Sequence, residues 1–396
     1  MSPAAKREYL EGIRPRYQRA GKKEKGLILD EFCKVCGYDR KYAIRLIKRT
    51  TKLKRKRAGL RKVYGREVAL VVKEIWLATE QMCSKRLKAA LPIWLPYYEH
   101  ERGVLPRLTR EKVLHLSAPT IDRLLHPVRA KLTGKGLCGT KPGTLLRNQI
   151  PIRTEHWGIT QPGYLEADTV AHCGSSMAGN FIWSLTFTDI LSGWTENRAI
   201  WNKGAEGVLR QVQELEETLA FPILGFDCDN GSEFLNYHLL RYFQDRPQPV
   251  SFTRSRPYRK NDNAHVEQKQ WTHVRQLFGY QRFEQPQLIE SMNDLYKHEW
   301  SLFQNYFRPS FKLKKKERIN SKYRRIYEKP QTPYQRLIAS PHLTTKAKKR
   351  LTETYRTLNP FQLKKAIERK LQVIFNLHQT APLWVNAPLP SDRPLW

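Results

Sequence analysis

The sequence has little that belongs to a membrane-bound or secreted protein. Its apolar runs all fall short of the roughly 18 residues that a membrane-spanning helix needs. The opening Met1–Arg7 segment lacks the apolar stretch of a signal peptide. The 6 cysteines are too scattered for a disulfide framework. We therefore expect a soluble, intracellular protein with no membrane partner.

Acidic residues and early histidines are also scarce. The chain has 37 Asp and Glu against 71 Lys and Arg, which leaves a formal net charge of +34. Such an imbalance points to a polyanionic partner. No histidine precedes His100, so Cys33 and Cys36 lack the histidine partners that would favour a zinc module there.

What is present indicates a folded, multidomain chain. A length of 396 residues suggests two to four domains, and 11% aromatic residues argue against a disordered basic tail. The charge is uneven, because acidic residues outnumber basic ones between positions 160 and 246. This pattern favours a metal-binding core flanked by basic segments that grip a polyanion, although any domain can be locally acidic.

Three acidic residues stand where a rigid scaffold could bring carboxylates together. Asp168 lies in a predicted strand whose alternation puts it on one face with Tyr164 and Glu166. Asp229 follows a short apolar run that reads as a buried strand, and an Asn-Gly turn comes next. Glu267 lies near the start of a predicted helix that runs to about residue 277.

Carboxylates in this pattern suit a particular chemistry. They are hard oxygen ligands of the kind that Mg²⁺ and Mn²⁺ prefer. Two such ions about 3.5–4 Å apart can hold the attacking and leaving oxygens of a phosphoryl displacement. Asp227 competes with Asp229 for this role, and Asp189 is a further acid near the predicted site.

These stretches resemble a known family. The strand with Asp168, the stretch Asp229–Phe234 and the stretch Asn263–Glu267 look like the DDE core of retroviral integrases and bacterial insertion-sequence transposases. The resemblance covers roughly residues 156–285. It implies an RNase H-like fold and catalytic, metal-binding roles for Asp168, Asp229 and Glu267. It also implies two Mg²⁺ ions per active site, for which Mn²⁺ would substitute.

The resemblance further implies a transposase of a bacterial mobile element. Such an enzyme would bind the terminal inverted repeats, cleave DNA 3′ ends and transfer them into target DNA. The expected partners are transposon-end DNA, target DNA and further copies of the chain, as a dimer or tetramer on DNA in the bacterial cytoplasm, at the nucleoid. Two alternatives stay open: an RNase H-like nuclease that does not join ends, and a DNA-binding regulator with an inactive core.

The expected fold class is multidomain, with N-terminal all-α helix-turn-helix modules, a central α/β mixed sheet of RNase H-like type and a mainly helical C-terminal segment. Within the core we expect the order strand, strand, strand, helix, strand, helix, short strand, helix. The predicted boundaries are 1–50 (helix-turn-helix domain), 51–66 (basic linker), 67–133 (second helical DNA-binding domain), 134–155 (linker), 156–285 (catalytic core), 286–343 (basic DNA-contacting region) and 344–396 (helical segment and tail).

The first 50 residues carry helix-turn-helix patterning. Leu27, Ile28, Phe32 and Val35 suggest the buried face of one helix, which Gly37 would end. Asp39 would cap a second helix whose opposite face is basic. We predict a DNA-recognition helix, and a plain helical hairpin with a solvated basic face is the alternative.

Basic side chains expected to contact DNA occur in five segments. They lie in the second helix of the first domain, in the first linker, in the second helical domain, just before the Glu267 helix, and in the segment 308–330. These residues are Lys41, Arg45, Lys48, Lys54, Arg55, Lys56, Arg57, Arg123, Arg254, Arg256, Arg259, Lys260, Lys314, Lys315 and Lys316. His172, His265 and Lys269 could touch substrate phosphates or lie behind the site.

Overall fold

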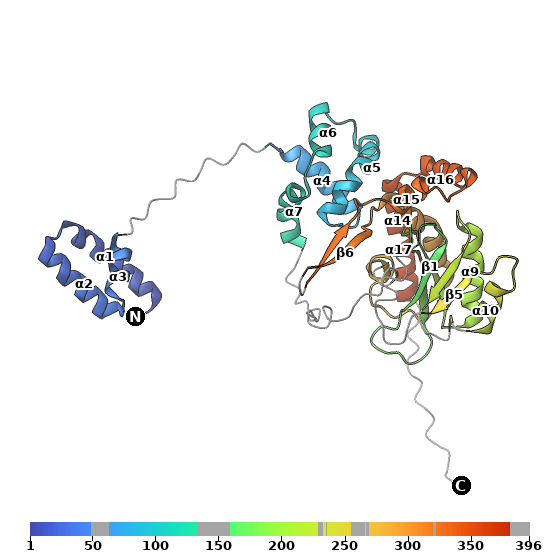
Figure 1. Ribbon diagram of the computed structural model, residues 1–396, viewed down its shortest axis with the longest axis horizontal. Coiled ribbons are helices and arrows are strands. Elements are labelled where there is room, and N and C mark those ends of the chain that lie inside the picture. Colours follow the sequence, from blue (N-terminus) through green and yellow to red (C-terminus); the bar gives the residue numbers. More distant parts are fainter. Residues whose placement is uncertain are drawn as a thin grey trace, which may run out of the picture. The chain divides into compact units, whose positions relative to one another are not determined.

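The structure is a computed structural model that describes residues 1–48, 63–132, 159–228, 233–234, 236–254, 266, 269–319 and 322–380. At residues 130–132, 254, 316, 322 and 380 it describes the backbone alone. The chain divides into two compact units, Met1–Val63 and Tyr64–Trp396, each of which is described by itself (Figure 1).

The N-terminal unit consists of the helices α1 (Pro3–Arg19), α2 (Lys22–Cys36) and α3 (Arg40–Lys48). As predicted, Gly37 ends α2 in the left-handed region at φ 68°. The carboxylate of Asp39 accepts the Lys41 amide at 2.9 Å and so caps α3.

The buried face predicted for α2 is wrong at two positions. Leu27 and Val35 are 69% and 46% exposed, whereas Leu29 and Cys36 are buried beside Ile28 and Phe32. The reason is that α2 packs on both α1 and α3. Because the prediction did not include α1, it placed the buried stripe of α2 over Leu27 and Val35 instead of Leu29 and Cys36.

The larger unit begins with four helices: α4 (Arg66–Ala78), α5 (Ser84–Arg102), α6 (Arg107–Leu114) and α7 (Ala118–Leu132). The Ser117 hydroxyl accepts the Thr120 amide at 3.3 Å and so caps the start of α7. On α5, the Trp94 indole donates to the Phe307 carbonyl at 2.9 Å. These helices therefore share one apolar core with the C-terminal half of the chain.

The predicted mixed sheet is confirmed. Its strands are β1 (Tyr164–Ala171), β2 (Ile182–Asp189), β3 (Thr195–Trp201), β4 (Gly225–Cys228) and β5 (Ser251–Arg254), in the spatial order β3-β2-β1-β4-β5. The first three strands pair antiparallel, and β4 and β5 run parallel to β1. Two helices, α9 (Ala205–Thr218) and α10 (Tyr237–Gln244), make the connections into β4 and β5.

After β5 the chain is helical again, apart from one hairpin. The elements are η2 (Gln270–Arg275), α12 (Gln276–Phe278), α13 (Leu288–Leu295), η3 (Tyr296–Trp300), α14 (Ser301–Phe307), the antiparallel pair β6 (Leu313–Ile319) and β7 (Lys322–Tyr327), α15 (Pro333–Ala339), α16 (Thr345–Thr357) and α17 (Pro360–Thr380). The Asn359 side chain accepts the Phe361 amide at 2.9 Å and so caps the start of α17. In the described part of the chain, no helix combines the length and apolarity needed to cross a membrane.

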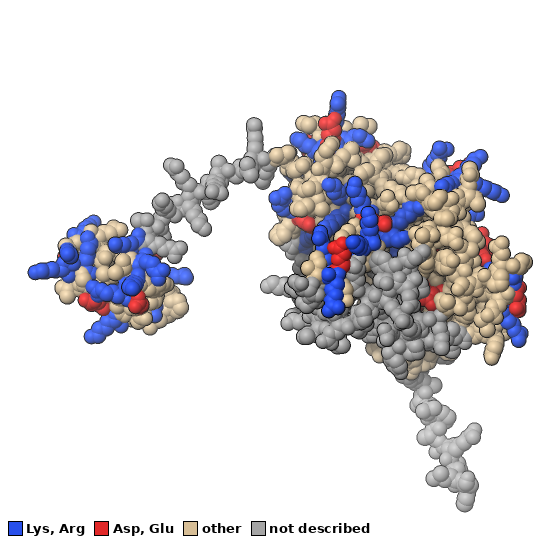
Figure 2. Space-filling model, in the orientation of Figure 1, with Lys and Arg blue, Asp and Glu red and all other residues tan. Residues whose placement is uncertain are grey.

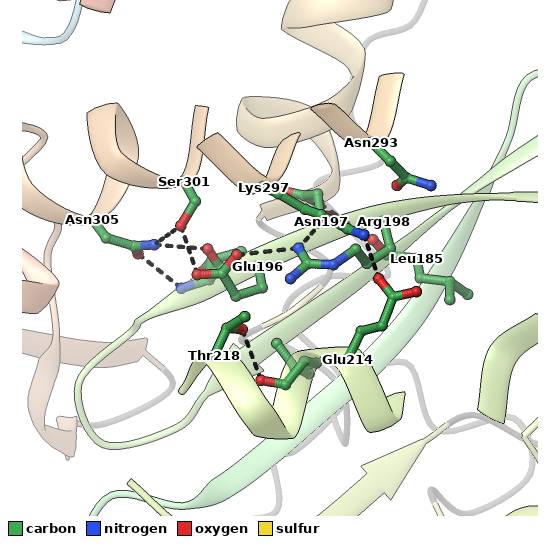
Figure 3. A network of polar contacts seen from close by, with 12 residues as sticks. Leu185, Glu196, Asn197, Arg198, Glu214, Thr218, Asn293, Lys297, Ser301 and Asn305 are labelled. Carbon is green, nitrogen blue, oxygen red and sulfur yellow. Dashed lines mark hydrogen bonds and ion pairs between the residues drawn. The ribbon is translucent and has the colours of Figure 1, made fainter. Parts of the chain in front are cut away.

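Helices cover both faces of the sheet, and a buried polar network fastens one of these layers (Figure 3). The Ser301 hydroxyl of α14 donates to the Glu196 carboxylate of β3 at 2.6 Å. Asn305 exchanges two hydrogen bonds of 2.9 Å with the Thr195 backbone. Arg198, 1% exposed, lies 3.3 Å from the Glu196 carboxylate. Because Ser301 and Asn305 of α14 each bond to a specific group of β3, the contact between these two elements is specific.

The pairing of β1 with β4 requires a residue without a side chain at position 225. A Cβ atom at this position would overlap the ring of Tyr164, its partner in the parallel register. Gly225→Ala should therefore destabilise the larger unit by about 1–3 kcal/mol in urea unfolding. Gly207→Ala on α9 is the control, since an added Cβ meets nothing within 4 Å there and a helix favours alanine. Equal stability of the two variants would contradict this packing.

Candidate active site and nucleic-acid interface

Asp168 lies in the middle of the central strand. It pairs with Thr186 of β2, and its neighbour Ala167 pairs with Cys228, the last residue of β4. The side chain is half-buried. One carboxylate oxygen accepts the Thr169 amide at 2.6 Å, and the other accepts the Gln270 side-chain amide. The strand thus presents an oriented carboxylate at the level where β4 ends.

Glu166 ties the next helical segment to the same strand. It is fully buried, and its Oε2 accepts the backbone N–H of Val266 at 3.0 Å. Gln270 makes the second contact to β1, through Asp168. Two residues that flank position 267 in sequence are therefore bound to the strand that carries Asp168. The sequence had assigned Glu166 to a strand face and gave no sign of this link.

Asp229 and Glu267, the other two predicted catalytic acids, lie outside the described residues. Among the described residues, no group of three acidic, histidine or cysteine side chains could hold a metal ion. Asp227, the competing candidate, is 5% exposed and accepts the Thr253 hydroxyl at 2.8 Å. In the parallel register Asp227 pairs with Glu166. Glu166 lies two residues before Asp168 on β1, so Asp227 is not level with Asp168.

Glu233 is a neighbour of the site that the residue predictions left out. It is 2% exposed and accepts the Lys203 ammonium at 2.6 Å and the Thr169 hydroxyl at 3.3 Å. Thr169 adjoins Asp168 on β1, but successive strand side chains point to opposite faces, so this ion pair lies on the face of the sheet opposite to the Asp168 carboxylate. The signal was present in the sequence, because Glu233 belongs to the motif that begins at Asp229.

Asp189 and His172 have structural roles. Asp189 closes the turn between β2 and β3 by accepting the amides of Gly163 at 2.8 Å and Ser192 at 2.7 Å, and burial raises the pKa of its carboxyl. His172 is fully buried and lies 2.7 Å from the Ser184 hydroxyl. Burial, and to a lesser extent the charge of Arg275, lowers the pKa of His172 to about 3, so it stays neutral.

The described DNA-binding candidates lie at the surface. Lys41, Arg45 and Lys48 are exposed on α3, Arg123 is exposed on α7, and Lys314 and Lys315 are exposed on β6. Figure 2 shows Lys and Arg side chains gathered over the β6–β7 hairpin. For Arg254 and Lys316 only the backbone is described. The remaining candidates lie outside the described residues: Lys54, Arg55, Lys56, Arg57, Arg256, Arg259 and Lys260.

A second set of basic residues, which the sequence did not bring together, gathers around the β2–β3 turn and the end of α14. Lys312, Arg336 and Lys269 donate to the backbone carbonyls of Leu191, Ser192 and Gly193, at 2.8, 3.0 and 3.3 Å. Arg86 of α5 donates to the Pro309 carbonyl at 2.6 Å. Arg308 directly precedes Pro309 in the chain. We call Arg86, Lys269, Arg308, Lys312 and Arg336 the cation cluster.

The cluster members are close enough to perturb one another. Burial, and then the charges of Arg86, Arg336 and Arg308, lower the pKa of Lys269 to about 7. Burial, and then the charge of Arg86, lower the pKa of Arg308 to about 9. Arg308 therefore stays charged at neutral pH although it is only 3% exposed.

The Glu166 contact predicts a local effect on the chain after β5. In Glu166→Ala the buried Val266 amide loses its acceptor, so its hydrogen exchange should speed up by about tenfold to a hundredfold. Glu217→Ala, at an exposed position of α9, should leave this exchange unchanged. Equal protection of the Val266 amide in both variants would show that Glu166 does not anchor this segment.

Comparisons with known proteins show which family the chain belongs to. No family model matches the chain. Part of the chain is similar to the crystal structure of the catalytic core domain of BIV integrase, with 15% identity, 46% of this chain and 96% of that chain covered, and a TM-score of 0.28. The uncharacterized protein y4rM of Sinorhizobium fredii is 37% identical over 338 residues, which are 85% of this chain and 96% of that protein. The chain therefore belongs to the same family as the Sinorhizobium protein y4rM.

Proposed function

We propose that this chain is a DDE transposase, which binds the terminal inverted repeats of its element, cleaves DNA 3′ ends and transfers them into target DNA. One observation carries the proposal: the segments that lead to all three predicted acids meet at β1. Asp168 is on that strand, Cys228 pairs beside it, and Val266 is bonded to Glu166.

Chain connectivity extends this argument to the other two acids. Asp229 directly follows Cys228 in the chain, and Glu267 directly follows Val266, while consecutive Cα atoms lie about 3.8 Å apart. In this proposal the three carboxylates converge at the end of β4. Asp227, held by Thr253, would then support the strand and take no part in catalysis.

The donor set fits a hard divalent cation. Asp168, Asp229 and Glu267 offer only carboxylate oxygens, which suit two Mg²⁺ ions, with Mn²⁺ as a substitute. Bound metal would supply the Lewis acidity for phosphodiester cleavage and joining. The chain's own contribution is position: Gln270 orients the Asp168 carboxylate, and Glu166 holds the start of the following helix. Both are positioning residues.

The charge distribution supports DNA as the substrate. The basic face of α3 fits a helix that lies in the major groove, and Arg123 of α7 would add a phosphate contact. The hairpin β6–β7 is a two-stranded ribbon, a shape that the major groove also admits. Since two element ends must be joined together, we propose that the active form is a dimer or tetramer on DNA.

The proposal is tested with a supercoiled plasmid that carries candidate element ends, in Mg²⁺ or Mn²⁺. The full chain should nick and join DNA. Asp168→Asn, Asp229→Asn and Glu267→Gln should each lower both activities by a factor of about 10³ or more, since each removes a metal-binding charge, while DNA binding persists. Asp227→Asn is the control and should keep most of the activity.

Three outcomes would argue for other functions. Activity in Asp229→Asn together with its loss in Asp227→Asn would move the catalytic role to Asp227. Nicking without joining would favour a nuclease. Binding without cleavage in either metal would favour a DNA-binding regulator with an inactive core.

The hairpin gives a separate prediction. Lys314 and Lys315 are exposed, and Lys315 lies 2.8 Å from Glu317. If both contact phosphates, the double alanine variant should weaken binding to any DNA sequence and reduce the slope of log K against log salt by about 1.8. The control is Lys346→Ala with Lys349→Ala on α16, a matched pair of exposed lysines, one of which faces Glu353. Equal slopes would exclude the hairpin as a DNA contact.

A further inference from the structure

Arg308 is the least explained member of the cation cluster. It is 3% exposed, and its Nε and Nη1 atoms are buried without a hydrogen-bond partner among the described residues. The charge of Glu80 acts on it, but the Glu80 carboxylate is already bound by Lys364. A buried guanidinium without a counter-charge is costly, so the site favours a bound anion.

A purely structural role accounts for the other members but not for Arg308. Arg86, Lys269, Lys312 and Arg336 all donate to backbone carbonyls, and so they could serve to fasten two loops to each other. The charge of Glu328 acts on Lys312 and Arg336, but carbonyl dipoles do not neutralise the remaining guanidinium charges of Arg86 and Arg308. No ion pair joins any cluster member to a carboxylate in the part of the chain that the structure describes. The hydrogen bonds to backbone carbonyls therefore leave positive charge in the cluster that is not neutralised.

We infer that Arg308, together with Arg86, Lys269 and Arg336, forms a binding site for a phosphate group of the DNA backbone. Guanidinium groups match phosphate oxygens with paired N–H donors. Arg86 binds the carbonyl of Pro309, which follows the buried Arg308, and Arg336 binds the carbonyl of Ser310 in the same loop. Arg336 and Lys269 also bind adjacent carbonyls of the β2–β3 turn. The assignment to DNA rests on the function proposed above, whereas the assignment to a phosphate does not.

The position of the site suggests which phosphate it holds. The turn that receives Lys269 begins at Asp189, which pairs with Leu165, three residues before Asp168 on β1. At the usual strand rise this is about 10 Å. Lys269 directly precedes Gln270, whose side-chain amide is bound to the Asp168 carboxylate, so the cluster extends from this turn to the segment beside Asp168. It would hold a phosphate of the bound strand near the one that is cleaved.

Arg308→Met tests the inference, because a phosphate site and a structural site predict opposite effects. In chloride buffer, removing an uncompensated buried charge should raise the thermal midpoint of the full chain. Inorganic phosphate and pyrophosphate should raise the midpoint of the wild-type protein, compared with chloride at equal ionic strength, and this response should be lost in Arg308→Met. Arg308→Lys keeps the charge and should keep part of the response.

The control is Arg369→Met, which removes one charge from an exposed position of α17 and should leave the phosphate response intact. A lower midpoint or failure to fold in Arg308→Met, or an unchanged response to phosphate, would overturn the site. DNA-binding measurements then identify the source of the phosphate. Arg308→Met should bind duplex DNA about tenfold or more weakly than Arg369→Met. Equal DNA affinities with a lost phosphate response would overturn the DNA assignment and favour a free oligophosphate.

These results are separable from the failure of the proposed function. If the wild-type chain never cleaves DNA but phosphate stabilises it through Arg308, the anion site stands and the transposase proposal falls. If cleavage depends on Asp168 but Arg308→Met binds DNA and phosphate normally, the reverse holds.

Discussion

The structure of the candidate site depends on one buried hydrogen bond, from the Val266 amide to the Glu166 carboxylate. Glu166 lies in the central strand, between an antiparallel and a parallel neighbour, where water cannot reach it. A buried carboxylate needs donors, and this one takes a donor from a segment 100 residues further along the chain. The contact that gives Oε2 of Glu166 a donor also fixes Val266 to the strand that carries Asp168.

The sheet can act as a rigid support because specific contacts fix the packing of α14 on β3 and the pairing of β4 with β1. On β3, Glu196 and Thr195 would lose their hydrogen bonds to Ser301 and Asn305 if α14 shifted by a turn (Figure 3). In β4, Gly225 allows the ring of Tyr164 to lie against the backbone. A carboxylate in the middle of β1 therefore has little freedom to move, as a site that binds charged ligands requires.

The sequence predicted what local chemistry determines. The strand and helix order of the sheet, the end of α2 at Gly37 and the cap of α3 at Asp39 all follow from residue type and spacing. The failures come from long-range packing. Leu27 and Val35 are exposed because an unpredicted helix, α1, turns the buried face of α2. The pattern likewise missed the helices α13 and α14, and it read the segment after residue 308 simply as basic. Of the three acids predicted to be catalytic, Asp168 lies among the described residues, and the catalytic role of all three stays a prediction.

The most informative miss concerns charge. In the sequence, Arg308 and Lys269 are two among 71 basic residues, and nothing separates them from the lysines of the hairpin. The fold separates them by solvation: Lys314 and Lys315 stay in water, where a charge needs no partner, whereas Arg308 is withdrawn from it. An exposed charge can attract a polyanion at a distance, but salt screens it. A buried, uncompensated charge gains most when an anion arrives and displaces little water, so its contribution falls less with salt. A DNA-binding chain with both kinds of charge can use the first to find DNA and the second to fix its position.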